Sequence, residues 1–198
     1  RATIYTALSQ MRRVSSSIKP EQKLSLPRYI HGTHRGRLCY IETPEGASCG
    51  LESQLAVGAY ISIKYPPQQL MALVQPHLTP GGTLVFVNGH PIGFGDTMVV
   101  RAVRAARRSG QIAKDVSVSY ADYIHIRSNS GRICRPLIIL PRVIKSFQEM
   151  LDQGLLEYVD VYEEDTIVIG ETHEELDHTL LMGLCAATIP YSNHNPAP

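Results

Sequence analysis

The spacing of hydrophobic positions predicts short helices and strands along the whole chain. In the first half, apolar residues recur at helical intervals within residues 2–14, and residues 70–74 suggest a further short helix. The stretch 51–65 fits a helix or a pair of strands. Residues 84–87 form an apolar run that ends at Asn88-Gly89, a dipeptide typical of tight hairpin turns.

The second half of the sequence also combines helical and strand patterns. Residues 97–109 predict a helix that ends at Gly110, with an inward face formed by Met98, Val99, Ala102, Val103 and Ala106. Strands are expected at 116–119, 123–127 and 133–140, a helix at 143–153, and a hairpin made of 155–161 and 166–169. The pattern indicates an α+β fold, with helices and short strands in two small subdomains.

Charge is distributed unevenly although the net charge is only +1. Residues 1–37 contain eight Lys or Arg and one acid, whereas residues 149–177 contain eleven Asp or Glu and no Lys or Arg. This asymmetry indicates that the basic end meets a polyanion, with a solvated charged face as the alternative. The acidic stretch is interpreted as a solvated face or as a surface for a basic protein.

Several classes of chemistry are not expected. The four cysteines are scattered without a C-x-x-C pair, so we expect reduced thiols and no zinc. His173 and His178 are five residues apart, which places them on different faces of a helix and argues against a metallohydrolase. No cluster of aspartates could hold two magnesium ions, and no apolar run is long enough for a membrane span.

The most informative segment is the glycine-rich run from Arg35 to Leu51. Pro44 favours a turn, and Gly46 and Gly50 allow close backbone approach. The arginines that precede the turn, Arg35 and Arg37, could clamp a phosphate or pair with nearby glutamates. On physical grounds alone, a nucleic-acid contact and a structural ion-pair turn remain equally open.

Residues 36–51 resemble the G-R-x-C-x-x-E-T-P-E-G-x-x-x-G-L motif of the second-largest (β-like) subunit of multisubunit DNA-directed RNA polymerases. Four further segments, taken in chain order, resemble motifs of this family: His31-Gly32-Thr33-His34, 130–137, 154–160 and 186–191. The details resemble eukaryotic or large-DNA-virus relatives. The resemblance implies a fork region at 1–66, an external domain at 67–140 and 141–170, and the start of a hybrid-binding region at 171–198.

The resemblance also implies residue roles. Nucleic acid would be contacted by basic residues of the first segment, namely Arg12, Arg13, Lys19, Lys23, Arg28, His34, Arg35 and Arg37. The loop beside the active centre would comprise Glu42, Thr43, Pro44, Glu45 and Gly46. The catalytic Mg²⁺ ions would be held mainly by the largest subunit, so this segment would bind no cofactor and lack the catalytic metal ligands.

The partners implied are the largest subunit, other polymerase subunits, template DNA and nascent RNA, without a membrane. The location implied is the nucleus, or the cytoplasm of a virus-infected cell. The first and last residues look like cuts through a longer chain. A different possibility is a free-standing, noncatalytic nucleic-acid-binding protein that uses the same fold.

Overall fold

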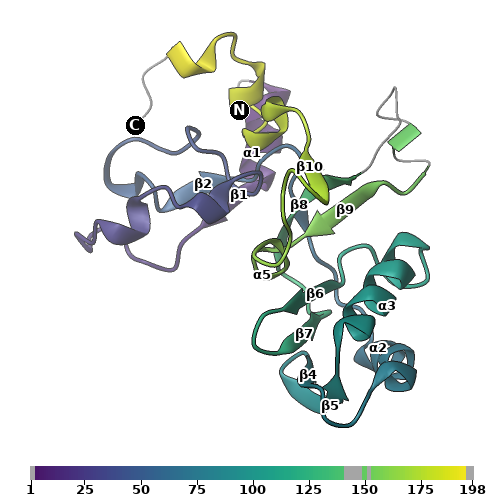
Figure 1. Cartoon of the computed structure of the whole chain (residues 1–198). Coiled ribbons are helices and arrows are strands. Elements are labelled where there is room, and N and C mark those ends of the chain that lie inside the picture. The colour runs from purple at the N-terminus through teal and green to yellow at the C-terminus, as the bar shows by residue number, and fades with distance from the viewer. Residues whose placement is uncertain (1–2, 141–148, 151–152, 195–198) are drawn as a thin grey trace. The chain divides into compact units, whose positions relative to one another are not determined.

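The computed structural model describes residues 3–140, 149–150 and 153–194 (Figure 1). The chain forms two compact units. The first combines Arg1–Ala59 with Leu176–Pro198, and the second is Tyr60–Glu175. Helices and several small sheets are present, so the predicted α+β class is confirmed. The predicted helix at 143–153 lies largely outside the described residues.

The first unit is built around helix α1 (Ile4–Met11) and a two-stranded antiparallel sheet of β1 (Arg13–Ser15) and β2 (Glu52–Gln54). The side chain of Thr3 caps α1 by accepting a hydrogen bond from the Thr6 amide. Most of the remaining chain consists of loops and short 3₁₀ turns, at Leu26–Arg28, Gly32–His34, Gly46–Ser48, His178–Leu181, Ala186–Thr188 and Ser192–His194.

The second unit contains a four-stranded sheet in the order β5-β4-β7-β6. Its strands are β4 (Thr83–Val87), β5 (His90–Gly95), β6 (Ser117–Tyr120) and β7 (Ile124–Arg127). The helices α2 (Pro67–Val74) and α3 (Thr97–Arg108) lie beside this sheet (Figure 1). The turn between β4 and β5 has positive φ at Asn88 and Gly89, which confirms the predicted hairpin.

A second sheet in the same unit centres on β8 (Ile133–Ile139). β8 pairs with β3 (Tyr60–Ile61), β9 (Leu156–Val159) and β10 (His173–Glu175), all antiparallel. The predicted hairpin of 155–161 with 166–169 is therefore wrong. Asp160 caps the short helix α5 (Val161–Glu164) directly after β9, so the chain turns away before a second strand can pair.

The main core lies between the four-stranded sheet and α2 and α3. Alternate residues of β4 and β7 are fully buried against apolar residues of both helices: Val85, Val87, Ile124, Ile126, Leu70, Val74, Val99, Val103 and Ala106. One face of each strand is thus apolar, as the period of two requires. The predicted inward face of α3 is wrong at Met98, which is 50% exposed, and it omits the buried Val100.

Candidate nucleic-acid interface

The loop 43–50 in the first unit is closed by the hydroxyl group of Thr43. This hydroxyl donates to the carbonyl of Glu52 at 2.7 Å and accepts from the amide of Gly50 at 2.9 Å. Gly46 and Gly50 both have positive φ, a conformation in which glycine is strongly favoured. Thr43 therefore holds the loop in shape, whereas Glu45 and Gly46 are exposed at its tip.

Glu42, just before this loop, connects distant parts of the first unit. Its carboxylate accepts from the Ser9 hydroxyl at 2.8 Å and from the Ala186 amide at 3.4 Å. A side chain at Gly183 would collide with the same carboxylate. Glu42 is thus a structural tie between the α1 segment and the segment around residue 186.

Arg28 fixes the preceding loop to this one. Its guanidinium donates to the carbonyls of Ala47 at 2.6 Å and Cys49 at 2.9 Å, both in the loop that Thr43 closes. It also donates to carbonyls of the segment 20–24, at 3.1 Å for Leu24 and 3.1 Å for Pro20. Arg28 therefore uses its donors on main-chain acceptors and orders both loops.

Other predicted nucleic-acid contacts have structural partners as well. Arg12 donates to the carbonyl of Ala56 at 2.6 Å, and Arg13 forms an ion pair with Glu52 at 2.8 Å. Arg37 is buried and donates to the carbonyl of Thr33 at 3.3 Å. The sequence did not reveal these intramolecular roles, because each acceptor except Thr33 lies more than thirty residues away.

The exposed cations of the loop differ from these arginines. Lys19 and Lys23 are exposed, and their ammonium groups make no hydrogen bond or ion pair with any residue that the structure describes. Arg35 is also exposed. His34 is half-buried, and burial together with the neighbouring His31 lowers the pKa of His34, so it carries little positive charge at neutral pH. Lys19 and Lys23 therefore offer accessible positive charge that no described acceptor engages.

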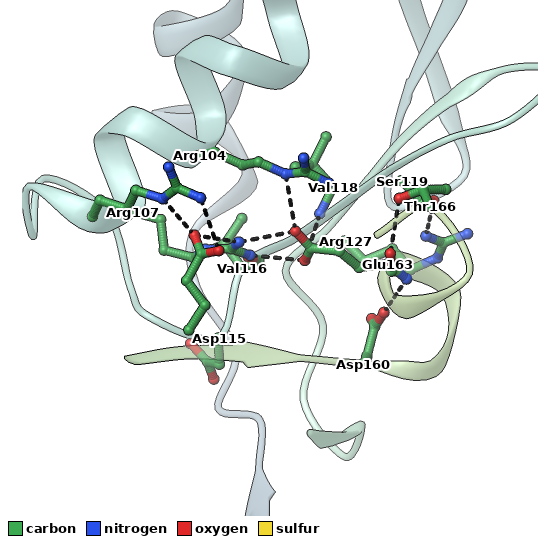
Figure 2. Close-up of polar contacts among 12 residues, drawn as sticks. Arg104, Arg107, Asp115, Val116, Val118, Ser119, Arg127, Asp160, Glu163 and Thr166 are labelled. Atoms are coloured by element: carbon green, nitrogen blue, oxygen red, sulfur yellow. Dashed lines mark hydrogen bonds and ion pairs between the residues drawn. The ribbon is translucent and has the colours of Figure 1, made fainter. Parts of the chain in front are cut away.

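A second polar cluster, which the sequence did not predict, lies inside the second unit (Figure 2). Glu163 is fully buried and accepts a bidentate pair of hydrogen bonds from Arg107, at 2.8 and 2.9 Å. It also accepts from Arg104 at 3.3 Å and from the amide of Val118 at 3.3 Å. Arg107 is only 5% exposed, so the pair is a buried one.

Glu157 of β9 is the second carboxylate of this cluster. It accepts from Arg107 at 2.9 Å, from Arg108 at 2.9 and 3.0 Å, and it contacts His173 at 2.7 Å. Burial by itself would raise the pKa of Glu157, but hydrogen bonds from His173 and Arg108 and the charge of Arg107 hold that pKa far below its ordinary value.

Asp160 is a further buried carboxylate whose pKa is lowered by its partners. It is 2% exposed and pairs with Arg132 at 2.8 Å. Burial by itself would raise the pKa of Asp160, but the hydrogen bond from the Glu163 amide and the Arg132 side chain lower it. The interpretation of the acidic stretch as solvated or partner-facing is therefore wrong for these three carboxylates, because arginines of the same unit neutralise them.

Possible metal ligands are dispersed in the described part of the chain. No group of three or more His, Cys, Asp or Glu among those residues is placed to hold a metal ion, and their four cysteines are free thiols. His173 contacts Glu157 instead. Among the helices that the structure describes, none is long and apolar enough to cross a membrane.

Comparison with known protein families assigns most of the chain. Residues 1–61 match RNA polymerase Rpb2 domain 3, residues 85–141 match domain 4, and residues 147–188 match domain 5. The three domains follow one another in the order of their numbers. The chain belongs to the Rpb2 family of RNA polymerase second-largest subunits. The resemblance stated from the motifs is confirmed.

Curated relatives of this family align with the complete chain. It is 33% identical to the DNA-directed RNA polymerase III subunit RPC2 of Drosophila melanogaster and 29% identical to the RNA polymerase II subunit RPB2 of Encephalitozoon cuniculi. It is 31% identical to subunit Rpo2 of the archaeon Saccharolobus shibatae. The chain spans 21–22% of the length of these relatives. The expected viral affinity stays a prediction.

Proposed function

We propose that this chain is the part of a DNA-directed RNA polymerase second-largest subunit that positions template DNA and the RNA–DNA hybrid near the active centre. The observation that carries the proposal is the consecutive match to Rpb2 domains 3, 4 and 5. In this proposal the chain contributes to nucleotidyl transfer without holding the catalytic Mg²⁺, which the largest subunit binds. Partners are the other polymerase subunits, and the location is the nucleus.

The loop that precedes the Thr43-closed loop supplies the nucleic-acid contact. Arg28 orders both loops through main-chain carbonyls, and this arrangement leaves Lys19 and Lys23 exposed. Lysine contacts to phosphate are independent of base sequence. Such contacts suit a protein that must move along any template.

The polymerase assignment is tested by copurification. A tagged form of the chain, expressed in cells that contain the polymerase, is expected to bring down a much larger subunit with a D-x-D-x-D loop, together with template-dependent RNA synthesis. A single-component peak that binds single strands without any larger subunit would contradict the assignment. That result would favour a free-standing nucleic-acid-binding protein.

The nucleic-acid contact has a separate test. In the double variant Lys19→Gln/Lys23→Gln, the slope of log Kobs for duplex DNA against log salt concentration should become less negative by about 2, or about 0.9 for each lost phosphate contact. Binding should weaken to a similar extent for unrelated sequences. Fluorescence anisotropy at several salt concentrations measures both quantities.

Lys64→Gln provides the control, because Lys64 is also exposed but belongs to the second unit. Its salt slope should remain that of the unmodified chain. An unchanged slope in the double variant would assign Lys19 and Lys23 to another role, while the polymerase assignment would still depend on the copurification.

A further inference from the structure

A pocket of about 400 Å³ in the second unit is lined by three arginines from one helix. These are Arg101, Arg104 and Arg108 of α3, and they recur at helical spacing, so their side chains share one face. Residues of the segments around β8 and β10 complete the lining: Ile139, Leu140, Thr172 and His173. Among the described residues, the lining contains no carboxylate.

The three arginines differ in how fully they are neutralised. Arg108 donates twice to Glu157, and Arg104 donates once, through Nε, to Glu163 at 3.3 Å. Arg101 is exposed, and its guanidinium makes no hydrogen bond or ion pair with any described residue. Several donors therefore remain without a protein acceptor in the described part of the chain. These are the donors of Arg101, both Nη atoms of Arg104 and Nη1 of Arg108.

The charge balance around the pocket is positive. Among the described residues, Arg104, Arg107 and Arg108 form ion pairs only with Glu157 and Glu163, and Arg101 forms none, so four positive charges of α3 meet two negative ones. Like charges on one helix face repel one another, so an anion bound between these arginines would relieve that repulsion. Arginine forks match the oxygens of phosphate groups in bidentate geometry.

We propose that this pocket binds a small oxyanion of the phosphate class that carries at least two negative charges, either as free pyrophosphate or as the phosphate chain of a nucleotide. Arg101 and Arg104 hold the phosphoryl oxygens, and Arg108, anchored by Glu157, closes the site. The pocket lies within the second unit and its binding does not depend on the proposed polymerase role.

Titration of the complete 198-residue chain with sodium pyrophosphate tests the site, with calorimetry for affinity and the arginine Nε–H resonances for location. Arg101→Gln is expected to weaken binding about tenfold, which corresponds to about 1.4 kcal/mol. Arg101→Lys keeps the positive charge but loses the forked guanidinium. Its affinity for pyrophosphate should therefore lie between that of the unmodified chain and that of Arg101→Gln. Inorganic phosphate and ATP, titrated in parallel, distinguish the free anion from a nucleotide.

Lys64→Gln is the matched control, because it removes one exposed cation of the same unit that does not line the pocket. It should bind pyrophosphate as the unmodified chain does. Equal loss in Lys64→Gln and Arg101→Gln, unchanged binding in Arg101→Gln, or no binding at millimolar pyrophosphate would each overturn the proposal. Displacement of pyrophosphate by far lower concentrations of DNA would overturn the assignment to a small ligand.

Discussion

Individual arginines of this chain act mainly on its own main chain and carboxylates. Arg28 was predicted as a phosphate contact, yet its guanidinium donates to carbonyls of two loops. Arg12 was predicted in the same way and donates to the carbonyl of Ala56. A guanidinium has five donors in a fixed fork, so it can satisfy several loop carbonyls that would otherwise lose water. These arginines therefore have a structural role, and their predicted contact with phosphate stays a prediction.

Arg28→Lys tests this role at the residue scale. Lysine keeps the charge but cannot reach carbonyls on both loops, so we expect the first unit to lose about 1–2 kcal/mol of stability. Hydrogen exchange of the Gly50 amide, which is bonded to Thr43, should accelerate. Arg101→Lys is the control, because Arg101 has no described partner, and equal losses in both variants would contradict the role.

At the scale of elements, local patterns predicted α3 well. Asp96 caps its start by accepting from the Met98 amide at 2.7 Å, and Gly110 follows its end with positive φ. The errors in its inward face, at Met98 and Val100, arise because the sheet and α2 decide which part of the apolar stripe is covered. The strand pairing of β9 could not be predicted, since its partner β8 precedes it by about twenty residues.

Removal of the α3 cap should have a modest and local effect. Asp96→Ala leaves the Met98 amide without its acceptor and is expected to lower the free energy of unfolding by about 1 kcal/mol. Thermal unfolding followed by circular dichroism gives the change. Asp122→Ala removes an exposed acid with no described partner and should have almost no effect, so a similar loss in both variants would contradict the capping role.

At the scale of the whole molecule, the second unit depends on buried charge. Arg107 of α3, Glu157 of β9 and Glu163 of α5 come from three elements and meet in one network. Figure 2 shows Arg107 and Glu163 of this network. Burial by itself would lower the pKa of Arg107, but the two glutamates raise it, so the guanidinium stays charged. The ion pairs of this network therefore stabilise the packing of these elements only while its carboxylates are ionised.

This network makes stability depend on acid pH. The pKa values of Glu157 and Asp160 are lowered by folding, so their contribution is complete above the unfolded carboxyl pKa of about 4 and is lost as the pH falls below it. Denaturant unfolding between about pH 7 and pH 2 measures this loss. Stability that remains constant over this range would contradict the described network.

The variant Glu157→Gln distinguishes the contribution of this network to acid sensitivity from the contribution of other titrating groups. It leaves Arg107 and Arg108 without one carboxylate and should cost about 3–5 kcal/mol at pH 7. The decline in stability with acid should also be shallower in this variant. Glu171→Gln, at an exposed position with no described side-chain partner, should keep both the stability and the pH dependence of the unmodified chain.

The sequence by itself determined the family, the α+β class, the hairpin at Asn88-Gly89 and the extent of α3. These features depend on motifs, turn chemistry and periodicity over a few residues. Only the tertiary structure decided which cations stay exposed, such as Lys19 and Lys23, and which are engaged internally. Glu163 meets Arg107 across 56 positions of the chain, and local pattern carries no information about such a contact. Burial then decides its chemistry, because a carboxylate removed from water must find its counter-charge within the fold.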